Sequence, residues 1–117
     1  MNKAFCKKME DVRLRLDFMA LSKDLNIANI AREAGISRSH MVRSFKKVYK
    51  QSPLEYCHSV RLRRVIDLLR EDKYIMKEIA DMVGISSIYH FSRWFKDKTG
   101  KSPTQYDLSE CAVLRDY

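Results

Sequence analysis

Residues Gly35–Lys47, GISRSHMVRSFKK, are followed later in the same 117-residue chain by a close copy, GISSIYHFSRWFK, at Gly84–Lys96. The copies are 49 residues apart at the glycine and 50 apart in the FK pair that closes each stretch, so the second turn carries one extra residue. Two copies are too few for a solenoid. The sequence therefore predicts a duplicated supersecondary unit.

Each copy has the pattern of two helices joined by a tight turn. Asn26 can cap a short helix that ends at Gly35, and Ser37 can cap a second helix that runs to about Lys50. Met41 and Phe45 of the second helix keep the helical period of a buried face. A short helix, a turn with glycine and a polar-faced helix form a helix-turn-helix, whose second helix can enter the DNA major groove. Helical hairpins with a glycine turn are also common in proteins that never touch DNA.

The rest of the chain also favours helices. Gly and Pro total five residues and β-branched alternation is nearly absent, which predicts an all-α fold. Apolar residues at steps of three and four predict a first helix over about Lys3 to Leu21. Ser52-Pro53-Leu54-Glu55 is a capping-box sequence that opens a long helix ending near Glu71. Ser102-Pro103-Thr104-Gln105 repeats that box, whereas Ile75 replaces the polar cap of the first copy, which predicts a frayed helix start.

These elements predict two helix-turn-helix subdomains joined by a long central helix. We expect the first subdomain over about residues 3–52, the linker helix over 53–72, the second subdomain over 73–109 and a tail over 110–117.

The charge balance narrows the class of partner. Lys and Arg number 23 against 15 Asp and Glu, which gives a net charge of +8, typical of nucleic-acid binding and less often of binding to anionic membranes. The basic residues concentrate in the second helix of each copy, whereas a membrane-surface helix spreads them along one continuous amphipathic face. The longest apolar run, Phe18 to Leu21, is far too short to cross a bilayer, and no secretory signal is visible. We expect a cytoplasmic, nucleoid-associated protein and no membrane partner.

The sequence offers little for catalysis or metal binding. Three widely spaced cysteines have no C-x-x-C pair and no histidine at zinc-finger distance, so they are expected to be reduced thiols. Cys57 and His58 are helix neighbours that point about 100° apart and cannot act as a nucleophile and its base. There is no phosphate loop and no carboxylate pair. We predict no enzyme activity, no cofactor and no metal site.

The outward faces of the two second helices are the predicted DNA-reading surface. An arginine can bind guanine O6 and N7 with two hydrogen bonds, a serine can bond several base edges, and an apolar side chain can touch a thymine methyl. Lysines further along the helix are expected to meet phosphates, which position the protein without specifying sequence. The predicted DNA-binding residues are Arg38, Ser39, Val42, Arg43, Lys46 and Lys47 in the first copy, and Ser87, Ile88, Tyr89, His90, Ser92, Arg93 and Lys96 in the second.

Each of these residues also has a structural interpretation. Arg43 and Arg93 hold matching places, yet either could be solvated or paired with an acid on a neighbouring helix. An exposed Tyr89 could pack on its own helix. Trp94 lies one turn from Phe91 and is better explained by packing than by base stacking.

With these motifs the chain resembles the DNA-binding domain of the AraC/XylS family of bacterial transcription regulators, over about Lys7 to Asp107. The most specific part is IADMVGISSIYHFSRWFKDKTGKSPTQY, residues 79–106, which is similar to the family signature of a turn glycine, F-S-R-x-F-K, G-x-S-P and a closing tyrosine. VRLRRVIDLL, residues 60–69, resembles the linker helix. The chain departs from the family pattern at Ile85, Ser87, Lys50 and Asp107.

The resemblance implies two helix-turn-helix units that present the third and sixth helices to successive major grooves, about 34 Å apart. It also implies a sequence-specific transcription regulator of double-stranded DNA, by analogy an activator that contacts RNA polymerase, with this domain binding as a monomer. Two alternatives stay open. The chain could be an interaction module that kept the fold and uses Ile88, Tyr89 and Trp94 as an apolar patch, or it could be the C-terminal piece of a larger ligand-sensing regulator.

Overall fold

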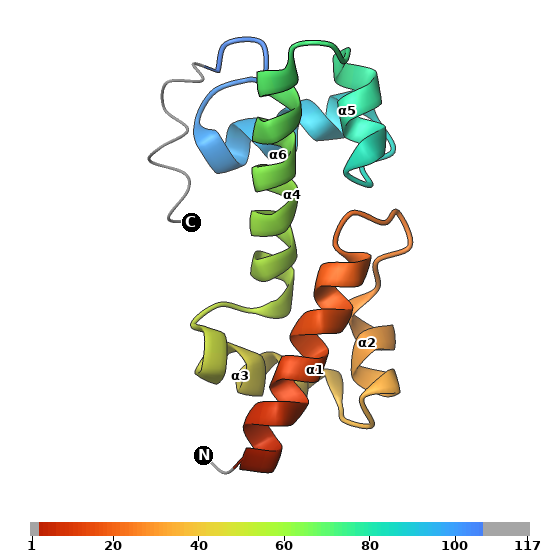
Figure 1. Cartoon of the computed structure of the whole chain (residues 1–117), viewed down its shortest axis with the longest axis vertical. Coiled ribbons are helices and arrows are strands. Elements are labelled where there is room, and N and C mark those ends of the chain that lie inside the picture. Colours follow the sequence, from red (N-terminus) through yellow and green to blue (C-terminus); the bar gives the residue numbers. More distant parts are fainter. Residues whose placement is uncertain (1–2, 107–117) are drawn as a thin grey trace. The chain divides into compact units, whose positions relative to one another are not determined.

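The computed structural model describes residues 3–106, and within that range the ordered elements are all helices (Figure 1). The prediction of an all-α fold is confirmed. The helices are α1 (Lys3–Met19), α2 (Ile27–Glu33), α3 (Arg38–Tyr49), α4 (Pro53–Glu71), α5 (Met76–Met82) and α6 (Ile88–Thr99). They fall into two compact units. Among the described residues, the first holds those up to Ala20 and Asp24–His58, and the second holds Leu21–Lys23 and those from Ser59 on.

The first unit is built from α1, α2, α3 and the first turns of α4. The Asn26 side chain accepts the backbone N–H of Asn29 at 3.1 Å, and the Ser37 hydroxyl accepts that of His40 at 3.1 Å, so both predicted caps are present. Helices α1, α2 and α3 pack on one another in pairs. The buried side chains of this unit include Met9, Val12, Leu16, Ala20, Ile27, Ile30, Ala31, Met41, Ser44, Phe45 and Cys57.

A polar network on the first unit joins α1 to the start of α4. The Tyr56 hydroxyl donates a hydrogen bond to Asp17, whose carboxylate also forms an ion pair with Arg13 one turn earlier, at 3.2 Å. Arg13 in turn stacks over the Tyr49 ring, 5.9 Å from its centre. Burial and the hydrogen bond to Asp17 raise the pKa of Tyr56 above its usual value, so this phenol stays protonated at neutral pH.

Helix α4 runs from Pro53 to Glu71, as its capping sequence predicts. The Ser52 hydroxyl accepts the backbone N–H of Glu55 at 3.1 Å, and Pro53 occupies the first helical position, where no amide hydrogen is needed. The helix contributes its first residues to one unit and the remainder to the other.

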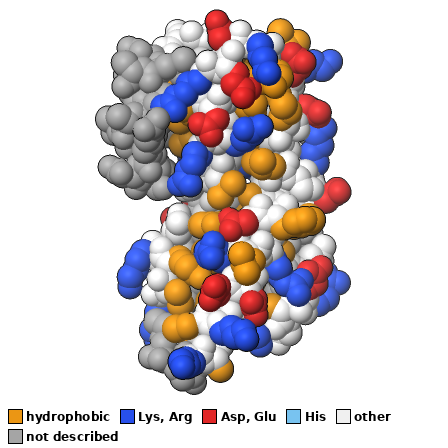
Figure 2. Space-filling model, in the orientation of Figure 1, with side chains coloured by type: hydrophobic (Ala, Val, Ile, Leu, Met, Phe, Trp, Pro, Cys, Tyr) orange, Lys and Arg blue, Asp and Glu red, His pale blue; other side chains and the backbone are white. Residues whose placement is uncertain are grey.

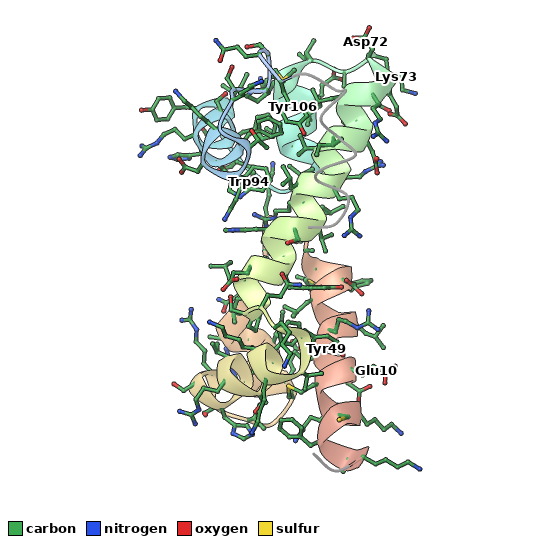
Figure 3. All side chains as sticks on the ribbon, turned by 90° about the vertical axis from the view of Figure 1, so that its left-hand side faces the viewer. Glu10, Tyr49, Asp72, Lys73, Trp94 and Tyr106 are labelled. Atoms are coloured by element: carbon green, nitrogen blue, oxygen red, sulfur yellow. The ribbon has the colours of Figure 1, made fainter. Side chains whose placement is uncertain are left out.

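The second unit repeats the helix-turn-helix with α5 and α6 around its own core. The core consists of Leu62, Val65, Ile66, Leu68, Ile79, Ala80, Val83, Phe91, Phe95 and Tyr106. The Tyr106 ring meets the Phe95 ring edge-on, with 5.3 Å between their centres (Figure 3). At the start of α5, Ile75 has no side-chain cap, but its backbone N–H donates to Glu78 Oε1 at 3.0 Å, so half of a capping box remains.

The segment Leu21–Lys23 belongs to the second unit, whereas the sequence predicted that the first helix extends into it. The first helix was predicted to reach Leu21, but α1 ends at Met19, and Leu21 instead packs against the core of the second unit. Arg61 Nη2 donates to the Ser22 carbonyl at 3.2 Å, and Lys23 forms an ion pair with Asp81 that lowers the pKa of that carboxyl. Long-range contacts, which local periodicity does not report, therefore end the helix.

The predicted second capping box was wrong within the described residues. Residues 103–105 form a turn, in which the Gln105 N–H donates to the Ser102 carbonyl at 3.0 Å and the Ser102 hydroxyl lies 3.2 Å from that of Thr104. The serine hydroxyl is thus engaged with a neighbouring side chain. The predictions for Asp107, for Cys111 and for the end of the second subdomain and the tail lie outside the described residues.

Candidate nucleic-acid interface

Helix α3 presents a row of exposed basic side chains. Its sequence, RSHMVRSFKKVY, holds four basic residues and no acid. Met41, Ser44 and Phe45 are buried, so they orient the helix and turn the other side chains outward. Of the six residues predicted to bind DNA here, Arg38, Ser39, Arg43, Lys46 and Lys47 are exposed and Val42 is half-buried.

Helix α6 presents a corresponding face that is less basic and more apolar. Phe91 and Phe95 are fully buried, which places Tyr89, His90, Arg93 and Lys96 on the exposed side. Figure 3 shows side chains of α6 projecting away from α4. Ile88 and Tyr89 are 49% and 66% exposed, so two large apolar side chains are accessible at the start of this helix.

Two of the residues predicted to bind DNA in the second copy are less accessible than the others. The Ser87 hydroxyl accepts the backbone N–H groups of Tyr89 and His90 at 3.2 and 3.5 Å, so it caps the helix. Ser87 and Ser92 are both half-buried. Their predicted contacts to DNA thus depend on side chains less accessible than those of Tyr89 or Arg93.

The basic charges of α3 and α6 have no acidic partner among the residues that the structure describes. The ion pairs in that part of the chain include Arg13–Asp17, Arg15–Glu33 and Lys23–Asp81, which lie outside these two helices. This removes the interpretation of Arg43 and Arg93 as partners of an acid within residues 3–106. It leaves two helices whose positive charge is available to phosphates or base edges.

The structure shows the surroundings of two further residues near the exposed faces, Trp94 and His40. Trp94 is half-buried and packs against the core of the second unit, as predicted. His40 is exposed near the start of α3 and matches His90 on α6, but it was not among the predicted residues. The 50-residue repeat spacing applied to His90 would have found it.

A second surface feature lies on the first unit, beside α1 and α2. A groove of about 500 Å³ runs between α1 and α2, with Leu14, Phe18, Met19 and Ile30 among the apolar residues that line it. Phe18 is 86% exposed and Leu14 is 52% exposed. The Arg15–Glu33 ion pair crosses its edge. Figure 2 shows apolar and charged side chains of both signs mixed over the face in view, so this side is not uniformly basic.

Residues 3–106 hold neither a membrane-spanning helix nor a metal-binding cluster. No helix there is long and apolar enough to span a bilayer. No group of three or more His, Cys, Asp or Glu side chains in the same range is placed to hold a metal ion.

Comparison with known proteins agrees with this arrangement. A family profile described as a helix-turn-helix domain matches residues 30–108. The Msm operon regulatory protein of Streptococcus mutans is 37% identical over 82 residues, which cover 70% of this chain and 30% of that protein. The lactose operon transcription activator of Staphylococcus xylosus is 28% identical over 99 residues, covering 83% of this chain and 36% of that protein. The chain thus spans about a third of these relatives.

Solved structures share the fold. The C-terminal domain of AraT, a response regulator from Geobacillus stearothermophilus, superposes with a TM-score of 0.79 at 25% identity, covering 85% of this chain and 82% of that one. The DNA-binding domain of AdpA, solved in complex with a target DNA, superposes with a TM-score of 0.75 at 21% identity over 93% and 97% of the two chains. Duplicated helix-turn-helix units, the matching profile and these neighbours together show that the chain belongs to the AraC family of helix-turn-helix DNA-binding domains.

Proposed function

We propose that this domain binds double-stranded DNA sequence-specifically as a monomer and regulates transcription, with α3 and α6 each reading one major groove. The observation that carries the proposal is the pair of matching exposed helices whose basic side chains have no acidic partner within the described residues. The regulatory names of the relatives support it, as does the DNA bound to the AdpA domain. Such a protein acts in the cytoplasm, on the nucleoid.

The exposed residues divide into those that specify sequence and those that position the protein. Arg43 and Arg93 are the base readers, because a guanidinium can bond guanine O6 and N7 in a fork. Ile88 offers an apolar side chain to a thymine methyl. Lys46, Lys47 and Lys96 lie one turn further along their helices and neutralise phosphates, which adds affinity without sequence preference.

Selection from random duplexes of about 30 base pairs tests the proposal. The expected result is an enriched site with two conserved boxes centred about one helical turn, roughly 34 Å, apart. Affinity should fall steeply with salt, with a log–log slope of roughly −5 to −9 if about six to ten phosphates are neutralised. No enriched sequence at physiological salt would rule out specific reading. A much flatter slope would instead favour the alternative of a protein-interaction module built on apolar contacts.

We further propose that the protein activates transcription by contacting RNA polymerase, and that the groove between α1 and α2 is the contact surface. Phe18 and Leu14 are 86% and 52% exposed in the same groove, and neighbouring exposed apolar side chains mark an interaction site. The groove provides room for an apolar side chain of the partner beside Leu14 and Ile30. Its acidic and basic edge residues can orient the partner.

Phe18→Ala separates this contact from DNA binding. Because the ring is exposed, its removal should leave thermal unfolding and operator affinity unchanged. Transcription from a promoter carrying the selected site should fall about tenfold, since a buried aromatic anchor at a protein interface contributes more than 1 kcal/mol. Leu54→Ala, which truncates another half-exposed apolar residue of the first unit outside the groove, is the matched control. Equal transcription from both variants would contradict the proposed contact.

A further inference from the structure

An aromatic ring contacts the base-reading arginine in only one of the two units. Tyr89 and Arg93 lie one turn apart on α6, and the guanidinium carbon of Arg93 lies 5.9 Å from the centre of the Tyr89 ring. That separation is within the range of cation–π attraction, which is about 6 Å. The Tyr89 ring also meets the His90 ring edge-on, with 6.1 Å between their centres. The Tyr89 ring, although exposed, thus lies close to two neighbouring side chains of α6.

The duplicated sequence allows the surroundings of Arg93 to be compared with those of Arg43. Residues Ser39 and Arg43 of α3 occupy the places of Tyr89 and Arg93, at the repeat spacing of 50. No ring contacts the Arg43 guanidinium among residues 3–106. The two arginines thus share a position in the fold but differ in how firmly their side chains are held.

A held arginine reads a base more selectively than a mobile one. A long arginine side chain loses rotamer freedom when it binds, and a contact that restricts it beforehand reduces this loss. A guanidinium held in one orientation also matches the fork of guanine O6 and N7 but cannot readily turn toward the different edge of adenine. Restriction therefore adds to discrimination between bases as well as to affinity.

We propose that Tyr89 is a positioning residue that holds Arg93 for guanine recognition, so that the second unit discriminates at its guanine more strongly than the first. This inference rests on the proposed function, in which Arg93 contacts a base. It assigns to Tyr89 an action through Arg93 in addition to any contact that Tyr89 makes itself.

The test measures base discrimination on synthetic duplexes. The ratio of dissociation constants is compared for the selected site and for the same site with the guanine of the second box changed to adenine. Tyr89→Ala should lower this ratio about threefold, which is the size of a cation–π contact at an exposed position. Tyr89→Phe keeps the ring and should retain the ratio. In the same Tyr89→Ala variant, discrimination in the first box should stay unchanged, because no ring contacts Arg43 among residues 3–106.

A double-mutant cycle separates action through Arg93 from direct reading by Tyr89. In an Arg93→Ala background, Tyr89→Ala should cause no further loss of the guanine ratio, because the residue that Tyr89 positions is gone. Additive losses would overturn the inference. Thermal unfolding is measured alongside and should stay unchanged, since Tyr89 is 66% exposed.

The same experiment distinguishes failure of the inference from failure of the proposed function. If Arg93→Ala relaxes a guanine but Tyr89→Ala does not, only the positioning role is overturned. If Arg93→Ala relaxes no base at all, Arg93 is not a base reader, and the inference falls with that part of the proposed function.

Discussion

Gly84→Ala should destabilise the protein far more than Gly35→Ala, although both glycines occupy the same place in the repeated turn. Their φ angles are +81° and +75°, a region that costs an L-residue about 1–2 kcal/mol. The difference lies in what a Cβ atom would meet. At Gly84 it would come within 2.6 Å of the Leu21 carbonyl oxygen and 2.9 Å of the Ser22 carbonyl carbon, whereas at Gly35 nothing lies within 4 Å.

The collision at Gly84 is difficult to relieve. The atoms in the way belong to the backbone of a segment held by the apolar packing of Leu21, the hydrogen bond from Arg61 and the ion pair between Lys23 and Asp81. Overpacking of this kind adds about 1–3 kcal/mol to the conformational cost. We therefore expect Gly84→Ala to lower the free energy of unfolding by about 2–5 kcal/mol and Gly35→Ala by about 1–2 kcal/mol.

Denaturant unfolding of both variants measures this difference, and amide hydrogen exchange locates it. Exchange should accelerate in the second unit for Gly84→Ala and in the first unit for Gly35→Ala. Equal losses of unfolding free energy would mean that only the φ angle matters and that the Leu21–Lys23 segment readily moves away from Gly84.

The comparison of Gly35 with Gly84 also shows what the sequence could predict. The turn glycines, the caps by Asn26, Ser37 and Ser52 and the buried phenylalanines of α3 and α6 follow from local rules of period and capping, and the structure confirms them. The contact of Leu21 with the second unit does not follow from such rules, because it joins residues far apart in sequence. Helix α1 accordingly ends two residues before the predicted end.

The candidate site was predictable to a similar extent. Burial of Met41 and Phe45 determines which residues of α3 face outward, and period alone reveals this. The engagement of the Ser87 hydroxyl as a cap, the half-burial of Val42 and the contact between Tyr89 and Arg93 depend on side-chain positions within the folded unit. A pattern of residue types does not determine those positions.

Removing the two base-reading arginines should remove most of the sequence preference while general DNA binding persists. Each of Arg43→Ala and Arg93→Ala should weaken binding to the selected site by about 1–3 kcal/mol, roughly five- to 150-fold. Each variant loses one bidentate pair of hydrogen bonds to guanine. The effect should be confined to one box for each variant. Because each unit has its own core and both arginines are exposed, neither substitution should alter thermal unfolding.

Lys47→Ala is the control that separates reading from positioning. Lys47 is exposed on α3 one turn beyond Arg43, and its assigned role is a phosphate contact. Its removal should weaken binding to all duplexes equally and reduce the salt slope by about 1. If Arg43→Ala and Arg93→Ala behaved like Lys47→Ala, both arginines would be phosphate contacts, and specificity would have to come from Ile88, Tyr89 and the deformability of the DNA itself. The double variant decides between these cases. Two independent readers should lose affinity additively, since the arginines belong to separate units, which brings the remaining affinity close to that for unrelated DNA.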